Sequence, residues 1–346
     1  MKKIKILVPY LIISIILIIG IMIKVYADYL YSSSDVYYEN NSSTLTSTDL
    51  QSAIEELDTK CENRIADSRE CPEGYKCTEI QPICKRATTL HTETCSQTSS
   101  YCYADGYYSS GSKGTTTITY GSLGTSGTLT SGDAFDCDVN GDGTFNASTE
   151  RFYYVSDYFD TSTKTFDNDY AVFIYYSNTT SGTASTSNVA WYSSSNSTIY
   201  GPTTAMAQLP TTSQWRDDLL KSTTRNILGG SSGSSLTTTY KSNFSYSGYA
   251  ARLLTMQELY SGCYDGSRSI TTDGGLSTKC KYLMERTKYS TSSYATNGPW
   301  LESASTGSDA WNVYSSNRLV GSYSASTSSY GGARPAIEVL KSDVSY

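Results

Sequence analysis

A junction between a strand and a helix is encoded by Arg252-Leu253-Leu254-Thr255-Met256-Gln257-Glu258-Leu259. The apolar pair Leu253-Leu254 is followed by Thr255, and Glu258 stands three residues further on. This spacing is a capping box, in which each side chain accepts a hydrogen bond from the backbone N–H of the other residue in the first helical turn. We therefore expect a helix that begins directly after Thr255.

Short strands are expected on both sides of this junction. Runs of β-branched and aromatic residues, separated by clusters of Gly, Ser, Asn and Asp, are typical of strands joined by turns. A second helix is expected in the run 211–220, with Thr211 or Thr212 as its cap. Strands with two short helices predict an α+β fold for residues 115–346. The predicted strands lie at 115–120, 151–155, 171–176, 300–301, 311–313 and 336–339.

Three segments of this region resemble elements of formylglycine-generating-enzyme-like and C-type-lectin-like domains. Residues 252–259 are similar to a strand and capped helix of that superfamily, Trp300-Leu301-Glu302-Ser303 resembles its Trp strand, and residues 332–339 (Gly-Ala-Arg-Pro-Ala-Ile-Glu-Val) resemble its closing strand. The order of the three also resembles a domain of bacterial surface proteins. The resemblance implies a C-type-lectin-like domain over 115–346. It does not extend to catalysis, because the paired reactive cysteines of the oxidase branch have no counterpart after Cys280.

Hydroxyl groups take the place of charge along the whole chain. Its 346 residues include 57 Ser, 45 Thr and 32 Tyr, and only 17% are charged, against roughly 25% in an ordinary soluble domain. With 33 acidic and 26 basic residues, the net charge is −7. An acidic chain without a basic stripe is not expected to bind nucleic acid. The single histidine, His91, excludes sites that need two histidines and is expected to have a structural role.

The N-terminus predicts export. Three lysines precede the uncharged apolar run Ile6–Ile23, which as a helix would be about 27 Å long, close to the ~30 Å hydrocarbon core of a bilayer. The lysines are expected to stay on the cytoplasmic side, which places the chain after Lys24 outside the cell. We expect a single-pass signal-anchor over 1–27 in the cell membrane. The alternative is a secretory signal that is cleaved after Ala27.

Nine cysteines agree with an oxidising compartment, in which disulfides are the default. None belongs to a Cys-x-x-Cys pair of the kind that binds zinc. Cys263 and Cys280 stand apart from the other seven and are expected to bond to each other. The pairing among the seven stays open, with one thiol left over. Residues 61–102 hold six of the nine cysteines, so a disulfide-stapled connector is expected over 67–114.

Residues 28–66 are expected to form a spacer and a stalk helix. Thr48 and Gln51 make another capping box, and the apolar residues that follow recur on one helical face. The segment 43–57 resembles the stalk repeat of phage tail-fibre-type proteins, which implies a homotrimer formed through residues 43–66. The alternative is a helix that docks on the domain that follows it.

A calcium loop is a candidate at Asp138-Val139-Asn140-Gly141-Asp142-Gly143-Thr144. Such a loop needs oxygen ligands at positions 1, 3 and 5, a glycine for the sharp turn and a carbonyl at position 7. The carboxylate expected at position 12 is replaced by Thr149 and arrives one residue late, as Glu150. The alternative is a metal-free hairpin loop between strands at 134–139 and 150–155. The candidate Ca²⁺ ligands are Asp138, Asn140, Asp142 and Thr144.

Two segments, 190–197 and 322–330, have the composition of binding loops. Tyrosine supplies rigid contact area at a small entropic cost, and Ser and Asn supply adaptable hydrogen bonds. The second segment directly precedes the closing-strand motif, where lectin-fold proteins that are diversified by retroelements vary their ligand loops. The alternative is that a low-charge exported chain uses Ser and Tyr throughout. The candidate ligand-binding residues are Trp191, Tyr192, Trp311, Tyr323 and Tyr330.

Together these patterns predict a membrane-anchored extracellular protein of the adhesin type. It is expected to bind a glycan or another surface protein without catalysis. The first alternative is a structural or assembly protein of the cell surface. The second is a secreted hydrolase, whose paired carboxylates the sequence does not locate.

Overall fold

The computed structural model describes residues 81–95, 101–102, 106–107, 116–193, 197–232, 235–264, 278–290, 295–313 and 321–346. All of them belong to the second of two compact units, Ile80–Tyr346. The predicted membrane segment at 6–23 and the predicted stalk and trimer segment at 43–66 lie outside the described residues. In the described part of the chain, no helix combines the length and the apolar character that a bilayer crossing requires.

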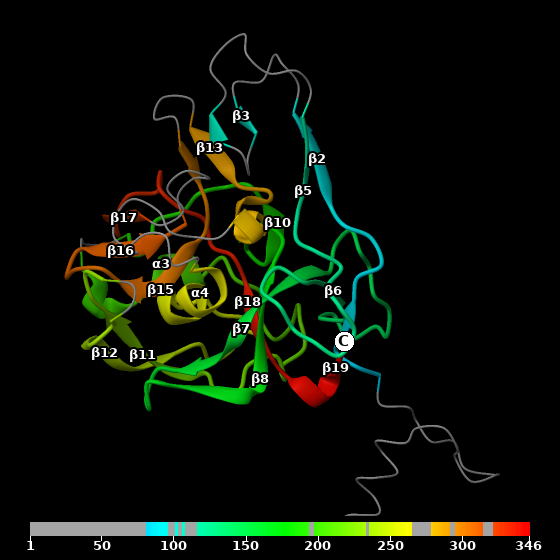
Figure 1. Ribbon diagram of the computed structural model, residues 1–346. Coiled ribbons are helices and arrows are strands. Elements are labelled where there is room, and N and C mark those ends of the chain that lie inside the picture. The colour runs from blue at the N-terminus through cyan, green and yellow to red at the C-terminus, as the bar shows by residue number, and fades with distance from the viewer. Residues whose placement is uncertain are drawn as a thin grey trace, which may run out of the picture. The chain divides into compact units, whose positions relative to one another are not determined.

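A six-stranded sheet runs through the domain in the order β18-β8-β7-β6-β1-β19 (Figure 1). Neighbouring strands are antiparallel except for β1 and β19, which are parallel. Strand β1 lies in the segment that the sequence assigns to the connector, and it pairs with both β6 and β19. The strands are β1 (Cys84–Arg86), β6 (Ala134–Cys137), β7 (Arg151–Asp160), β8 (Thr165–Tyr175), β18 (Ala336–Leu340) and β19 (Val344–Ser345).

A five-stranded sheet has the order β12-β11-β15-β16-β17 and lies on the side of the domain where α3 is found (Figure 1). Its strands are antiparallel neighbours except for β11 and β15, which are parallel. The strands are β11 (Thr224–Gly229), β12 (Thr238–Ser245), β15 (Trp300–Ala304), β16 (Asp309–Asn312) and β17 (Gly321–Ser324).

Four two-stranded ladders and five short helical segments complete the described structure. The ladders are β2 (Thr92–Cys95) with β5 (Thr116–Thr119), β3 (Tyr101–Cys102) with β4 (Gly106–Tyr107), β9 (Asn178–Thr180) with β10 (Thr183–Ser185), and β13 (Lys288–Ser290) with β14 (Ala295–Asn297). The α-helices are α3 (Thr203–Met206) and α4 (Met256–Cys263). The 3₁₀ segments are η1 (Thr198–Tyr200), η2 (Thr278–Met284) and η3 (Lys341–Asp343).

Helix α4 begins where the capping box predicts. The Thr255 side chain accepts a hydrogen bond from the Glu258 backbone N–H, and the Glu258 carboxylate accepts one from Thr255 N at 3.0 Å. The helix packs closely on β7, because a Cβ added to Gly262 would lie 2.0 Å from the Val155 carbonyl oxygen. Only glycine fits at that contact, so this residue sets how near α4 comes to the large sheet.

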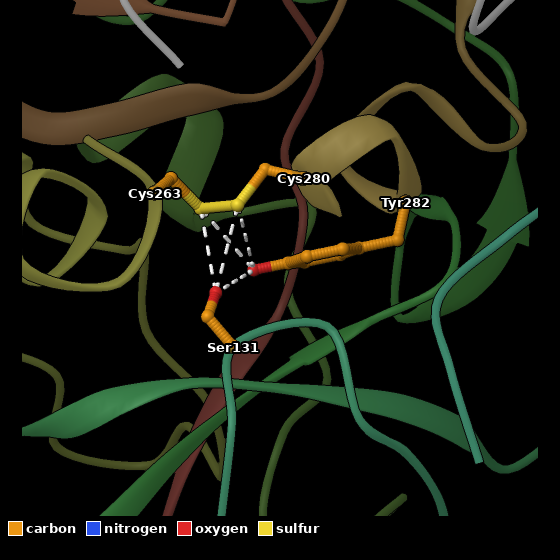
Figure 2. The surroundings of a disulfide bond; sticks show 4 residues. All are labelled: Ser131, Cys263, Cys280 and Tyr282. Carbon is orange, nitrogen blue, oxygen red and sulfur yellow. Dashed lines mark hydrogen bonds between the residues drawn. A yellow bond between two sulfur atoms is a disulfide. The ribbon is translucent and has the colours of Figure 1, made fainter. Parts of the chain in front are cut away.

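A disulfide joins the end of α4 to η2. Cys263 and Cys280, the pair that stands apart in the sequence, are bonded and fully buried. The Ser131 hydroxyl lies 3.5 Å from each of the two sulfur atoms and 3.1 Å from the Tyr282 hydroxyl (Figure 2). A second disulfide, between Cys84 and Cys137, links β1 to β6.

The predicted α+β class is wrong, and the fold is mainly β. The predicted strands are confirmed, but the predicted helix at 211–220 does not form. Its backbone groups are used by distant partners instead, because Arg216 N donates to Val139 O at 2.7 Å and Leu219 O accepts from Glu338 N at 2.8 Å. A regular helix would have to give up these long-range bonds. Within the described residues, α-helix is confined to the short α3 and to α4.

Candidate functional site

Five charged side chains meet in the interior, and we call them the buried charge cluster. They come from both sheets, from α4 and from the junction before it, and each is at most 1% exposed. Arg252 donates to both oxygens of Glu258, at 2.5 and 2.9 Å, and also to Glu338. Arg225 donates from its Nε to both carboxylate oxygens of Glu302, each at 3.0 Å, and from its Nη1 to Glu338 at 3.3 Å. The members are Arg225, Arg252, Glu258, Glu302 and Glu338.

The buried charge cluster joins the three segments 252–259, 300–303 and 332–339, which the sequence analysis singled out. Arg252 and Glu258 belong to the first segment, Glu302 to the Trp strand and Glu338 to the closing strand. Sequence reasoning assigned no role to the last two, although each is a lone charge inside an apolar run. A charge within an apolar run has to be paired once the run is buried, so this pattern could have identified both glutamates as members of an ion pair.

Two guanidinium groups face three carboxylates in this cluster. The pKa values of two of these carboxylates, Glu258 and Glu302, shift in opposite directions. Burial alone would raise the pKa of Glu258, but the Arg252 charge and its hydrogen bonds outweigh burial and lower it. Burial raises the pKa of Glu302 above its ordinary 4.5, against the opposing charges of Arg225 and Arg252. Of Glu258 and Glu302, Glu302 is therefore the one whose protonated form is favoured by folding.

Replacing Glu302 with glutamine is expected to flatten the pH dependence of stability. Because the folded-state pKa is raised, the contribution of Glu302 is fully present below pH 4.5 and is lost as the pH rises through the folded-state value. A glutamine at position 302 has nearly the same shape but cannot ionise, so Glu302→Gln is expected to remove the loss of stability with rising pH. The measurement is the free energy of unfolding in urea across a pH series.

Glu258→Gln is the matched control, and the sign of its effect is opposite. A lowered pKa means that the stabilisation by Glu258 is present above pH 4.5 and is lost on acidification, so this variant is expected to lose stability at neutral pH. Equal pH slopes for wild type and Glu302→Gln would contradict the assignment of the raised pKa to Glu302.

Arg334, two residues before β18, is a further buried cation, and it donates to several loop carbonyls. Its Nη1 donates to Leu283 O at 2.9 Å, its Nη2 to Glu285 O, and its Nε to Asn178 Oδ1 at 3.1 Å. Burial lowers its pKa to about 10. The side chain thus fixes the end of η2 and has a structural function.

His91 is also held by structural contacts. Its Nδ1 lies 2.6 Å from Glu285 Oε1, and its Nε2 lies 2.7 Å from Ala147 O. These contacts tie the segment 81–95 to η2 and to the loop after β6. The ring therefore serves to join three segments of the chain.

A surface of aromatic and apolar side chains forms where two loops meet, and we call it the tyrosine surface. Tyr192 stacks on Tyr200 with ring centroids 5.2 Å apart, and Tyr323 stacks on Tyr330 at 4.2 Å. Tyr192 N donates to Ala325 O at 3.0 Å, so the loop that carries one stack is bonded to the loop that carries the other. Tyr200 is 48% exposed and Ile199 47%. The members are Tyr192, Ile199, Tyr200, Tyr323 and Tyr330.

The two predicted tryptophans lie in the core. Trp191 is fully buried and donates from its indole N–H to Leu301 O at 2.8 Å. Trp311 is 1% exposed and donates to Gly230 O at 3.1 Å. The three predicted tyrosines are thus half-buried, on two loops that are bonded to each other, and the two tryptophans lie in the interior.

Sequence reasoning missed two members of the tyrosine surface, Ile199 and Tyr200. They follow the first binding-loop segment directly, in the run Thr198-Ile199-Tyr200-Gly201-Pro202. An apolar pair between a Ser-rich stretch and a Gly-Pro turn was the signal that would have found them.

Residues 138–150 form the loop of the β6–β7 hairpin, which we call the β6–β7 loop. Hydrogen bonds within this loop involve all four candidate ligands. Asp142 N donates to Asn140 Oδ1 at 2.9 Å, and Gly143 N donates to Asp138 Oδ2 at 3.0 Å. The fourth, Thr144, donates from its backbone N–H to Asp142 Oδ1 at 2.8 Å. Among the described residues, no group of three or more His, Cys, Asp or Glu side chains is placed so that it could hold a metal ion. The hairpin topology is as the alternative predicted.

Glu150, which the sequence pattern placed one residue late, points back into this loop. Its Oε2 accepts from Asn146 N at 2.8 Å, and its side chain is buried. Burial raises the pKa of Glu150 to about 7; the Asn146 N–H opposes this, and the Asp142 and Asp138 carboxylates add to it. The Glu150 carboxylate therefore interacts electrostatically with the two Asp carboxylates of the loop.

Comparison with known proteins gives no match: neither a family model, nor a curated protein, nor a solved structure is similar to this chain. The two candidate sites, the tyrosine surface and the β6–β7 loop, are therefore assigned from the residues of the chain itself.

Proposed function

We propose that the protein is a non-catalytic binding protein of the cell surface that recognises a carbohydrate through the tyrosine surface. The observation that carries this proposal is the pair of stacked tyrosines on neighbouring loops, with Tyr200 and Ile199 about half exposed. A ring face packs against the C–H groups of a sugar ring, because the aromatic face is electron-rich and those hydrogens carry partial positive charge.

The polar groups around the tyrosine surface also suit a neutral ligand. The segments 188–193, 197–204 and 321–330 contain Ser, Thr and Asn but no charged residue. The Ser193 hydroxyl, on the loop that carries Tyr192, lies 3.0 Å from the Thr204 hydroxyl of α3. Hydroxyls can both donate and accept, so they match the hydroxyl groups of a carbohydrate without the desolvation cost of an ion.

The surroundings support a rigid site. Asn188 Nδ2 donates to Ser329 O at 3.0 Å, and the Trp191 backbone carbonyl accepts from Ala205 N at 3.3 Å. These contacts hold both loops against a group of buried apolar residues that includes Trp191 and Trp300. Preorganised loops lose less entropy on binding. The lectin-like resemblance and the predicted signal-anchor complete the proposal of an extracellular adhesin.

Alanine at Tyr200 or at Tyr323 is expected to weaken carbohydrate binding by about 1–2 kcal/mol each, roughly tenfold in Kd, because each stack loses one ring. The test begins with a glycan array probed with the full chain in detergent. The affinity for the best glycan is then measured by calorimetry for wild type and both variants.

Phe166→Ala is the matched control for this experiment. Phe166 is an aromatic residue of similar exposure, 39%, and it lies on the β7–β8 hairpin. Its variant is expected to bind as wild type does. An array without binding, together with a stable homo-oligomer, would replace the proposal with the assembly function. An equal loss in all three variants would contradict the placement of the site.

A further inference from the structure

We propose that the β6–β7 loop binds a calcium ion, with Asp138 and Glu150 as the carboxylate ligands that close the site and Asn140 and Asp142 as further oxygen donors. This inference is independent of the proposed function, because it concerns other residues and another ligand.

Two unsatisfied carboxylate oxygens point to a bound cation. Asp138 is 5% exposed and Glu150 3%, and Asp138 Oδ1 and Glu150 Oε1 are both buried without a hydrogen-bond partner. The other oxygen of Asp138 accepts from Gly143 N and that of Glu150 from Asn146 N, and the Asn140 N–H also interacts with the Glu150 carboxylate. A buried carboxylate oxygen without a partner is costly, and a metal ion removes that cost.

Among the described residues, no basic side chain forms an ion pair with Asp138, Asp142 or Glu150. The Arg216 side chain lies beside the loop, with its Cγ 3.5 Å from a Cβ added to Gly141, and its charge interacts with that of Asp138. Its guanidinium is paired with Asp218 at 2.5 and 2.9 Å. Lys85 lies over the Phe145 ring, 4.4 Å from its centroid. The carboxylates of the loop therefore remain in excess.

The backbone of the loop explains how a carboxylate at position 13 can replace one at position 12. Cys137 N donates to Glu150 O at 2.9 Å, and Glu150 N donates to Asn146 O at 2.8 Å, so the hairpin brings this residue back beside Asp138. Thr149 is exposed, and its carbonyl is engaged by the Tyr175 hydroxyl at 2.7 Å. Glu150, not Thr149, is thus the residue that closes the site.

The donor chemistry selects calcium. All donors in the loop are oxygens, which excludes the nitrogen and sulfur preferences of zinc and copper sites. Gly141 and Gly143 have φ of 73° and 77°, values that let the chain curl around a centre. Calcium accepts six to eight oxygens in an adaptable geometry, whereas Mg²⁺ demands a near-ideal octahedron.

The loop is anchored at its base, so the site can form without refolding of the domain. The Cys84–Cys137 disulfide ends one residue before Asp138, and Asp138 N donates to Ile83 O at 2.8 Å. On the other side, Ala147 O is held by His91 Nε2. Metal binding would then require only small movements of side chains within the loop.

Calorimetric titration of the chelator-treated full chain with CaCl₂ tests the proposal. We expect one site with a Kd on the order of 0.1–1 mM, as in extracellular calcium modules, and a rise of several degrees in Tm at saturating Ca²⁺. Glu150→Gln and Asp138→Asn are expected to weaken binding at least tenfold, whereas Thr149→Ala leaves it unchanged.

Asp160→Asn is the matched control, because Asp160 accepts backbone N–H groups in the β7–β8 turn, as Asp138 does in its loop. It is expected to bind Ca²⁺ as wild type does. If a variant does not fold, the change in the Tm of the wild-type protein on addition of Ca²⁺ still tests the proposal. The absence of heat and of a Tm shift in wild type at millimolar Ca²⁺, or an equal shift with Mg²⁺, would overturn the proposal.

Discussion

Replacing Arg252 with methionine is expected to destabilise the domain by about 3–5 kcal/mol, because it leaves buried carboxylates without their partner. Arg252 donates to both oxygens of Glu258 and to Glu338, and all three side chains are fully or almost fully buried. Glu338 retains its hydrogen bonds from Arg225 Nη1 at 3.3 Å and from Lys221 N at 2.7 Å, but Glu258 loses its ion pair. Urea unfolding of the full chain measures the loss.

Arg216→Met is the control for this prediction. Arg216 has an equally close ion pair with Asp218, but both side chains are substantially exposed. Exposed pairs contribute about 0.2–1 kcal/mol, so this variant is expected to unfold near the wild-type midpoint. A loss below 1 kcal/mol in Arg252→Met would mean that the buried charge cluster does not hold the two sheets and α4 together.

Removal of the Cys263–Cys280 disulfide is expected to have the next largest effect. The bridge closes a loop with a sequence separation of 17 residues, for which the chain-entropy model gives about 3 kcal/mol. The double variant Cys263→Ala/Cys280→Ala avoids leaving buried thiols. Its free energy of unfolding is compared with that of wild type under non-reducing conditions.

Ser131→Ala provides the control for the disulfide variant. It keeps the bridge and removes the hydroxyl that contacts both sulfurs and Tyr282 (Figure 2). We expect it to cost about 1 kcal/mol, the net value of one buried hydrogen bond. A double variant no less stable than Ser131→Ala would show that packing, rather than the bridge, joins α4 to η2.

Local sequence signals predicted the elements that depend on neighbouring residues. The capping box at Thr255 and Glu258 identified α4, and runs of β-branched and aromatic residues identified strands such as β7 and β18. The helix expected at 211–220 was wrong because Arg216 and Leu219 bond to residues far away in sequence. Where long-range bonds compete with local preference, local patterns do not decide the structure.

The candidate sites were predicted in part. Composition identified Tyr192, Tyr323 and Tyr330, which are half-buried on two loops that are bonded to each other, but it could not show that Trp191 and Trp311 face the core. Asp138 and its neighbours were found by spacing, whereas Glu150 became visible only through the hairpin that returns it to the loop. Burial and chain reversal are properties of the fold, and no short motif carries them.

The place of β1 has a mechanical consequence. A pull on the domain through the chain that precedes Gln81 enters at β1, which lies between β6 and β19 in the large sheet. Strands held by hydrogen bonds alone can be unzipped one bond at a time. Here the Cys84–Cys137 bridge passes the load covalently to β6, and the hairpin passes it on to the long strand β7. In the function that we propose, a domain that is pulled through its bound ligand would thereby be protected from unfolding from β1.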